Sequence, residues 1–291
     1  MQTSRYIVKR ILLALVSLFA IITITYFLMN LMPGDPFMSE KASEENRALL
    51  IAKYGLDQPV YVQYGKYLEN LLHGDMGTSY VSGKPVFSTF ISKLPATLLL
   101  TVTSILLTIL ISVPLGILSA VHQNRCSDYL IRTFSFTGNS LPNFFVSLLL
   151  MYLFAIRLGW FPVIATGVSL KSVAMPAITL AIAMSAKYVR QVRAAILEEL
   201  SQDYVVGAKA RGVRFSTILW GSVMRASLVT IITLLMLSVG NLLGGTAIVE
   251  SIFMWDGVGK MAVDAISMRD YPIIQAYVMW MAIIYVAVNL L

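Results

Sequence analysis

Cysteine and histidine, the side chains that proteins most often use to hold transition metals, are nearly absent from this chain. Cys126 is the only cysteine, and His73 and His122 are the only histidines. A single cysteine cannot form a disulfide within the chain. Two histidines far apart in the sequence do not make a zinc site of the usual type. We therefore expect this chain to bind no metal ion or other cofactor itself.

Charged residues are also scarce, at 13% of 291 residues, whereas 57% are hydrophobic, a composition unlike that of a soluble globular domain. Six apolar runs contain no Asp, Glu, Lys, Arg or His, and five of them reach the ~18 residues of a candidate membrane span. A lysine at a helix end can extend its ammonium to the membrane interface, so Lys187 to Val189 can complete the short run. We predict an all-α membrane protein with six transmembrane helices in the lipid bilayer. The runs are Ile11–Met32, Leu94–Val121, Thr133–Ile156, Ser172–Ala186, Ala226–Val249 and Ile273–Leu291.

The lack of charge inside these runs counts against two classes of membrane protein. A carrier coupled to protons or sodium usually needs an ionisable residue at membrane depth. An intramembrane hydrolase needs a base beside its nucleophile. The ion-coupled secondary carrier stays open as an alternative, because backbone groups can also form an ion site.

The phosphate-binding loop G-x-x-x-x-G-K-[ST] is missing as well. The three Gly-Lys pairs, at Gly65, Gly83 and Gly259, are followed by tyrosine, proline and methionine. The chain therefore does not hydrolyse ATP through such a loop. If ATP drives its work, a separate subunit must hydrolyse the ATP.

The net charge of +7 is distributed unevenly between the two sides of the predicted membrane. The segments 1–10, 122–132 and 187–225 carry twelve Lys and Arg against four Asp and Glu, whereas 157–171 and 250–272 carry four of each. Cytoplasmic loops are enriched in Lys and Arg, so both termini are predicted to be cytoplasmic. The positive charge thus indicates topology, and we expect no nucleic acid partner.

The first predicted span is followed by the only long segment outside the membrane. We divide the chain into residues 1–32 (cytoplasmic N-terminus and first span), an external loop at 33–93, and a five-helix core at 94–291. Within the loop, Arg47–Tyr54 and Val60–Leu72 have the apolar spacing of short amphipathic helices.

Polar and small residues occur inside two of the predicted spans. Asn139 and Asn143 lie in the third, and because an amide facing lipid is costly, we expect them to face protein or a water-filled path. The small residues of the fifth span favour close helix packing, with a pathway lining as the alternative. The residues of the fifth span considered for these roles are Gly240, Asn241, Gly244 and Gly245.

One polar interruption between spans, Glu198–Arg225, has the composition of an element that contacts another protein and is here called the polar segment. Apolar residues recur at helical spacing from just before this segment into it, which predicts an amphipathic helix. They are Leu197, Leu200, Tyr204 and Ala208. Ser201 or Asp203 is expected to cap the start of its short last part, Gly212 to end it in a left-handed conformation, and Ser216 to cap the next helix. The segment is either a basic inside loop or a docking element.

Sequence motifs favour docking. The run Gln202–Val205, followed by Ala208–Gly212, resembles the EAA loop of bacterial ABC-importer permeases of the oligopeptide, dipeptide and nickel branch. The turn Pro33–Pro36 and the stretches Tyr54–Pro59 and Glu250–Gly259 are similar to other parts of that family, in matching order. The family commonly has Asn and Pro soon after Arg225, where this chain has Ala226 and Thr230, so the start of the fifth span is expected to bend differently.

The resemblance implies that a loop at residues 190–225 supplies a coupling helix between helices 4 and 5, which docks in a groove of an ATP-binding subunit. The apolar face of Leu200, Tyr204 and Ala208 would bear the force, and the charged residues would set the register. The coupling residues implied are Glu199, Leu200, Asp203, Tyr204, Ala208, Lys209, Ala210, Arg211 and Gly212.

The resemblance also implies partners, location and cargo. We expect a second homologous permease that is a different chain, two ATP-binding subunits that carry ATP and Mg, and an extracytoplasmic substrate-binding protein. The complex would lie in a bacterial or archaeal cytoplasmic membrane and import oligopeptides or dipeptides by alternating access, with nickel or a metal chelate as the alternative cargo. The residues expected at the binding-protein docking surface or outer gate are Glu250, Phe253, Trp255, Arg269 and Asp270.

Overall fold

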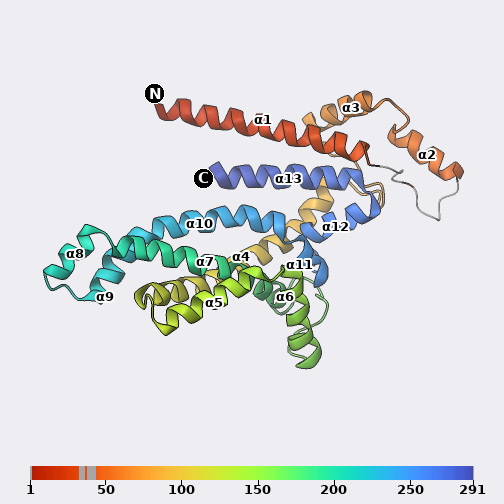
Figure 1. Cartoon of the computed structure of the whole chain (residues 1–291). Coiled ribbons are helices and arrows are strands. Elements are labelled where there is room, and N and C mark those ends of the chain that lie inside the picture. Colours follow the sequence, from red (N-terminus) through yellow and green to blue (C-terminus); the bar gives the residue numbers. More distant parts are fainter. Residues whose placement is uncertain (1, 33–36, 38–43, 291) are drawn as a thin grey trace. The chain divides into compact units, whose positions relative to one another are not determined.

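The computed structural model describes residues 2–32, 37 and 44–290, and nearly all of their regular structure is helical (Figure 1). Among these residues the only β-type pairing is one isolated bridge between Thr78 and Pro85. The chain forms two compact units. The first comprises the residues up to Pro95 together with those from Gly257 onward, and the second comprises Ala96–Asp256.

In the first unit, α1 lies alongside α13 (Figure 1). The two short helices predicted in the 33–93 segment are both present, whereas the Pro33–Pro36 turn lies outside the described residues. The helices of this unit are α1 (Gln2–Asn30), α2 (Glu44–Tyr54), α3 (Val60–Leu72), the first part of α4 (Val86–Val121), α12 (Val258–Met268) and α13 (Tyr271–Leu290).

In the second unit, α7 packs against α5, α6 and α10. Two of its elements are short π-helices, labelled η1 and η2. Its elements are the rest of α4, α5 (Cys126–Ser140), α6 (Asn143–Leu150), η1 (Met151–Arg157), α7 (Leu170–Leu200), α8 (Asp203–Ala210), α9 (Phe215–Ile218), η2 (Leu219–Val223), α10 (Met224–Gly245) and α11 (Ala247–Ile252).

Five helices are long and apolar enough to cross a membrane, and a bent helix pair makes a sixth span if it counts as one. The predicted all-α membrane class is confirmed. Three helices extend beyond their uncharged runs, because a helix does not stop where charge begins: α1 begins at Gln2, α4 begins at Val86, and α7 continues to Leu200. Pro95 is therefore an interior residue of α4. The five helices span Val8–Asn30, Val86–Val121, Leu170–Leu200, Phe215–Met236 and Tyr271–Val288.

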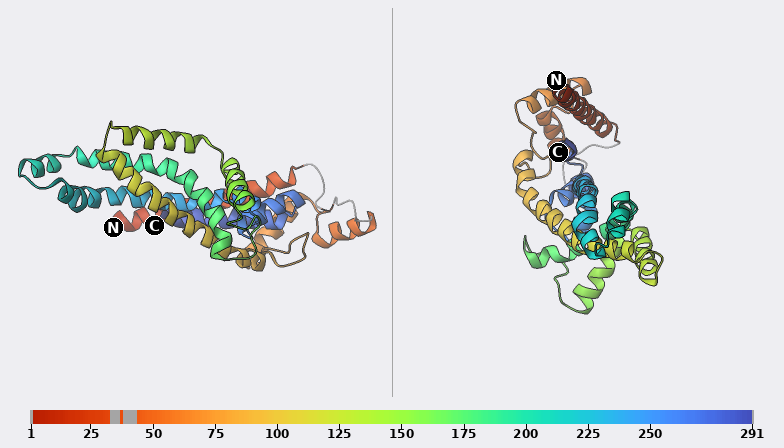
Figure 2. Two further views of the ribbon diagram at one scale, coloured as in Figure 1. Left: turned by 90° about the horizontal axis from the view of Figure 1, so that it is seen from below. Right: turned by 90° about the vertical axis from the view of Figure 1, so that its left-hand side faces the viewer.

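The third predicted span, Thr133–Ile156, is a broken helix. It consists of Cys126–Ser140 and Asn143–Arg157, which are bent by 102° at the break between them (Figures 1 and 2). Pro142 is the reason, because the residue before a proline is forced out of the helical region. Leu141 accordingly has an extended backbone, with φ −83° and ψ 128°.

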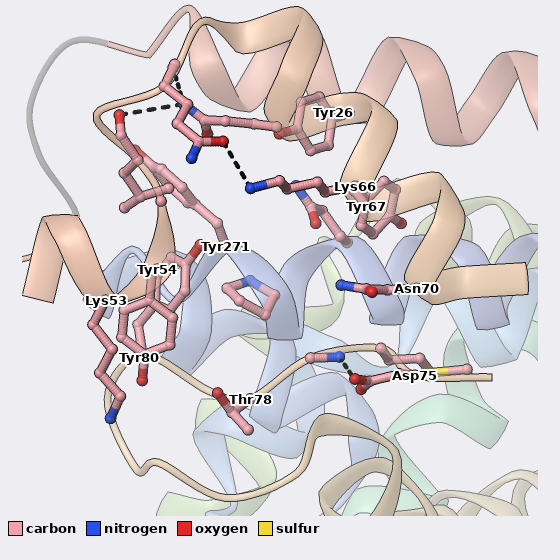
Figure 3. A pocket seen from close by; sticks show the side chains of 18 of the residues that line it. Tyr26, Lys53, Tyr54, Lys66, Tyr67, Asn70, Asp75, Thr78, Tyr80 and Tyr271 are labelled. Carbon is pink, nitrogen blue, oxygen red and sulfur yellow. Dashed lines mark hydrogen bonds between the residues drawn. The ribbon is translucent and has the colours of Figure 1, made fainter. Parts of the chain in front are cut away.

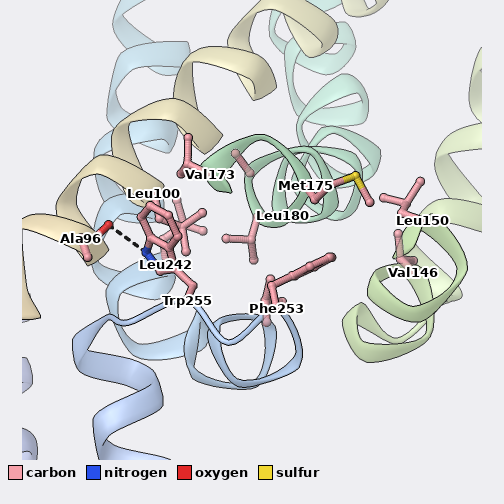
Figure 4. Packing of buried hydrophobic residues seen from close by; sticks show 12 residues of the cluster. Ala96, Leu100, Val146, Leu150, Val173, Met175, Leu180, Leu242, Phe253 and Trp255 are labelled. Carbon is pink, nitrogen blue, oxygen red and sulfur yellow. Dashed lines mark hydrogen bonds between the residues drawn. The ribbon is translucent and has the colours of Figure 1, made fainter. Parts of the chain in front are cut away.

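A buried cluster in the second unit joins α4, α6, α7 and α10 with α11 and the residues that follow it (Figure 4). Trp255 is among its largest buried side chains, and its indole Nε1 donates a hydrogen bond to the carbonyl of Ala96 at 3.1 Å. A buried tryptophan needs a partner for its N–H, and this bond supplies one. The loop after α11 is thereby fixed to α4.

A second close contact in this unit joins α4 to α7 at Gly116. A Cβ atom on Gly116 would lie 2.6 Å from Cγ1 of Val192 and 3.1 Å from the backbone oxygen of Val189. The backbone oxygen cannot move as a flexible side chain can, so the two helices approach this closely only because residue 116 is glycine.

We expect Gly116→Ala to force α4 and α7 apart and to destabilise the chain by about 1–3 kcal/mol, as overpacking does. Thermal unfolding of the purified protein in detergent measures the effect as a lower Tm. Gly65→Ala is the matched control, because that helical glycine in α3 has open space around it. Equal Tm values for the two variants would contradict the close-packing interpretation.

Candidate functional site

The polar segment begins where α7 ends. Ser201 closes α7 with its hydroxyl, which donates to the carbonyl of Glu198 at 2.7 Å, and Gln202 then turns the chain into α8 with an extended backbone. The N-cap of α8 is therefore Gln202 rather than Ser201 or Asp203, and it makes no side-chain cap bond. Gly212 ends this part with φ +76°, as predicted.

The return to the membrane is one continuous helical run from Phe215. Arg214 is the N-cap of α9, and Ser216, the predicted cap, lies inside the helix. A different bend was expected at the start of the fifth span. The structure has instead the π-helix η2, a wider helical turn, between α9 and α10. In Figures 1 and 2, α8 and α9 lie at one end of the pair formed by α7 and α10.

Val205 holds α8 to the rest of the second unit. Its side chain is fully buried in a cluster with Val192 and Ile196 of α7 and Ile218 of α9, and Leu200 and Ala208 pack against the same cluster. The predicted force-bearing face is thus corrected: Leu200 and Ala208 point toward the core of the chain itself. They follow the helical repeat because they pack inward with Val205.

The apolar side chains that α8 presents outward are Tyr204, which is 41% exposed, and Val206, which is 60% exposed. Val206 was missed by sequence reasoning because it falls outside the predicted stripe. Tyr204 donates its hydroxyl proton to Oε2 of Glu199 at 2.9 Å. Desolvation, and then this contact with Glu199, raise the pKa of Tyr204 above its ordinary value.

Charged and small side chains surround this outward apolar pair. Asp203, Lys209, Ala210 and Arg211 are all exposed. The ammonium of Lys209 lies 5.8 Å from the centre of the Phe215 ring, which places α9 beside the end of α8. The arrangement is an exposed, short amphipathic helix with an apolar centre and a charged rim, as helix-in-groove contacts require.

An ion pair that sequence reasoning missed links α5 to the part of α7 that leads into α8. Arg193 on α7 donates from Nε and Nη2 to the two carboxylate oxygens of Asp128, both at 2.8 Å. Asp128 is buried and also accepts from the hydroxyl of Ser119 at 2.5 Å and the backbone N–H of Asn124 at 2.9 Å. The only sequence signal was one acidic residue in a basic loop.

The two asparagines of the third span come together at its break. Asn139 near the end of α5 and Asn143 at the start of α6 line one hollow of about 210 Å³ with residues of α7 and α10. Gly240 is buried in α10 and does not line the hollow. The burial of Asn241, Gly244 and Gly245 is not described, so their predicted role stays a prediction.

Three residues predicted at the outer surface are buried in the second unit. Glu250 accepts hydrogen bonds from the hydroxyls of Thr97 at 2.9 Å and Thr246 at 3.1 Å, and Phe253 and Trp255 belong to the cluster of Figure 4. Their burial removes them from a docking surface on this chain, because a partner cannot touch them without unpacking the cluster. A role at an outer gate stays a proposal.

The other two residues lie in the first unit. Asp270 is buried and accepts from the hydroxyl of Ser79 at 2.5 Å and from the backbone N–H of Tyr80 at 3.0 Å. Arg269 ends α12 in a left-handed conformation with φ +57°. Asp270 thus fixes the loop before α4 to the start of α13 and is not exposed for docking.

The same unit contains a cavity of about 430 Å³ lined by tyrosine rings and amides (Figure 3). The rings of Tyr54 and Tyr80 are 4.7 Å apart, and Lys66 donates to Oε1 of Gln58 at 2.9 Å. Burial, and then the neighbouring tyrosines, raise the pKa of Tyr67 to about 12. No three or more His, Cys, Asp or Glu side chains group as a metal site within the described part of the chain.

The fold is similar to that of a solved ABC transporter. A chain from the structure of the MetNI methionine ABC transporter in inward-facing conformations matches 70% of this chain and 95% of its own length, with a TM-score of 0.53 at 14% identity. At that identity the likeness concerns the fold alone.

Curated relatives align along almost the whole sequence. The oligopeptide transport system permease protein AppB of Bacillus subtilis is 38% identical over 98% of this chain and 95% of its own length. The glutathione transport system permease protein GsiC of Salmonella typhimurium is 36% identical over 98% of this chain and 94% of its own length.

Residues 112–291 match the family described as "Binding-protein-dependent transport system inner membrane component", and residues 3–101 match the family of the corresponding N-terminal region. The first match alone covers more than half of the chain. With its membrane helices, the broken third span and the exposed helix between α7 and α10, the chain belongs to the inner membrane components of binding-protein-dependent transport systems, as an ABC-importer permease.

Proposed function

We propose that this chain is one of two permease subunits of an ATP-driven importer and that α8 is the site where an ATP-binding subunit docks. The observation that carries the proposal is the position of α8: Val205 anchors it in the core, and Tyr204 and Val206 point outward between charged residues. Exposed apolar side chains on a rigid helix fit a hydrophobic groove in a partner. The polar segment would lie in the cytoplasm with both termini.

The partners follow from the family. Two ATP-binding subunits, which carry ATP and Mg, would bind inside the cell, one of them at Glu199–Gly212. A second, homologous but different permease would complete the central path, and a substrate-binding protein would deliver cargo outside. Closure of the ATP-binding subunits on ATP would be transmitted through the coupling helices, so that the path opens alternately to the two sides of the membrane.

The cargo is proposed to be peptides. AppB is named for oligopeptide transport and GsiC for transport of glutathione, which is itself a small peptide. Nickel or a metal chelate is the alternative, since a binding protein can select such a cargo outside the membrane. Uptake of labelled peptide by the reconstituted complex, with unlabelled peptide or nickel as competitor, separates the two.

Val206→Asp is expected to abolish docking without unfolding the chain. The substitution places a charge at the centre of an apolar contact, where desolvation of the carboxylate is costly. We expect a loss of about tenfold or more in co-purified ATP-binding subunit and a matching loss of ATP hydrolysis stimulated by the binding protein.

Val81→Asp is the matched control, because Val81 is 55% exposed but lies in the first unit. Unchanged co-purification and stimulation in the Val206 variant would contradict docking at α8. If no ATP-binding subunit co-purifies with the wild-type chain, and uptake collapses with a proton ionophore, the ion-coupled carrier replaces the importer as the preferred function.

Removal of Arg193 is expected to loosen the end of α7 that leads into α8. Arg193→Ala leaves the Asp128 carboxylate buried without its guanidinium partner, and breaking a buried ion pair in this way costs about 3–5 kcal/mol. We expect a lower Tm and, in the assembled complex, ATP hydrolysis that the binding protein stimulates less. The exchange of both residues, Asp128→Arg with Arg193→Asp, tests whether the pair itself matters.

Lys171→Ala is the control for this variant, since it removes an exposed cation from the other end of α7. A Tm for Arg193→Ala equal to that of the control would show that the pair contributes little to stability, as exposed pairs do.

A further inference from the structure

The hollow beside the broken third span is lined by residues of α5, α6, α7 and α10. Its polar residues Asn139, Asn143 and Lys187 are here called the rim, and its apolar residues Leu180, Met184 and Leu242 are called the floor. At about 210 Å³ it is smaller than the roughly 300–1,000 Å³ of pockets that enclose whole small molecules. It can hold one end of a larger cargo.

The break in the third span brings the two rim amides to the hollow. Asn139 lies in the last turn of α5 and Asn143 is the first residue of α6, and the 102° bend between the two helices directs both to the same site.

Lys187 adds the only charge on the lining. The side chain is exposed and directly follows the uncharged run Ser172–Ala186, so Lys187 lies where the apolar part of α7 passes into its charged end. A lysine there can extend its ammonium to the membrane interface or into a water-filled path, and the hollow that it lines offers the second.

The three rim side chains have no hydrogen bond or ion pair with the rest of the described chain, unlike the nearby Tyr188 and Arg193. Tyr188, also on the lining, donates to the carbonyl of Leu234 at 3.1 Å. One turn further along α7, the guanidinium of Arg190 lies 5.1 Å from the centre of the Phe136 ring, and Arg193 is bound to Asp128. The free polar groups of the hollow are therefore one ammonium and two amides, with no acidic residue on the lining.

We propose that this hollow binds the terminal carboxylate of a peptide on its way through the membrane. This inference rests on the proposed function. Lys187 pairs with the carboxylate, the amide N–H groups of Asn139 and Asn143 donate to it, and the apolar floor takes the last side chain. Because all three rim residues are exposed, the contact is weak enough for the peptide to leave.

The test measures uptake into proteoliposomes that hold the full complex, supplied with binding protein and subsaturating tri-alanine or tri-alanine amide. Each rate is divided by the wild-type rate for the same peptide, so the preference of the binding protein cancels. We expect Lys187→Gln to lower tri-alanine uptake about tenfold, the size of one charge-assisted hydrogen bond, and to leave uptake of the amide within about twofold.

Three further variants sharpen the result. Lys187→Arg keeps the charge and is expected to keep most of the tri-alanine uptake. Asn139→Asp adds a carboxylate that occupies Lys187, so it should reproduce the selective loss without removing any side chain from the rim. Lys171→Gln, at the other end of α7, should change neither rate.

Equal losses of the free acid and the amide in both Lys187→Gln and Asn139→Asp would overturn the inference, and so would unchanged uptake of both peptides. These results leave the proposed function intact. A wild-type complex that takes up neither peptide overturns the proposed function, and the carboxylate site with it.

Discussion

The burial of Val205 is the contact on which the cytoplasmic architecture proposed here depends. α8 has only eight residues, too few to be stable alone in water. It is held as a helix because one fully buried valine inserts among α7, α9 and η2, and because Leu200 and Ala208 close the same cluster from either side. This inward anchoring is what leaves Tyr204 and Val206 free to face a partner.

Sequence reasoning found the elements whose signal is local. The apolar runs, the two helices after the first span and the left-handed Gly212 all follow from composition, periodicity or one residue's conformational freedom, and the structure contains them. Which side of α8 faces inward is not a local property. Leu200 and Ala208 repeat at helical spacing whether they pack on their own chain or on another, so only the tertiary contacts show that they pack on their own.

The same limit applies to the polar residues of the membrane helices. Pro142 was visible in the sequence, but a proline in a membrane helix can be accommodated by a kink, so it did not predict a break of this size. The pairing of Asp128 with Arg193, 65 residues apart, left no pattern that a single sequence could reveal. Burial of Glu250 and Asp270 was equally hidden, because acidic residues beside apolar runs are usually exposed.

The close contact at Gly116 has a mechanical consequence. α4 and α7 meet there with no room for a Cβ atom, and Arg193, the residue directly after Val192 on α7, ties the same helix to α5 through Asp128. Because α7 is held at neighbouring residues by both α4 and α5, it cannot slide or bend there without losing a contact. If a partner docks at α8 as proposed, a displacement of α8 would therefore move α4, α5 and α7 together rather than bend α7 alone.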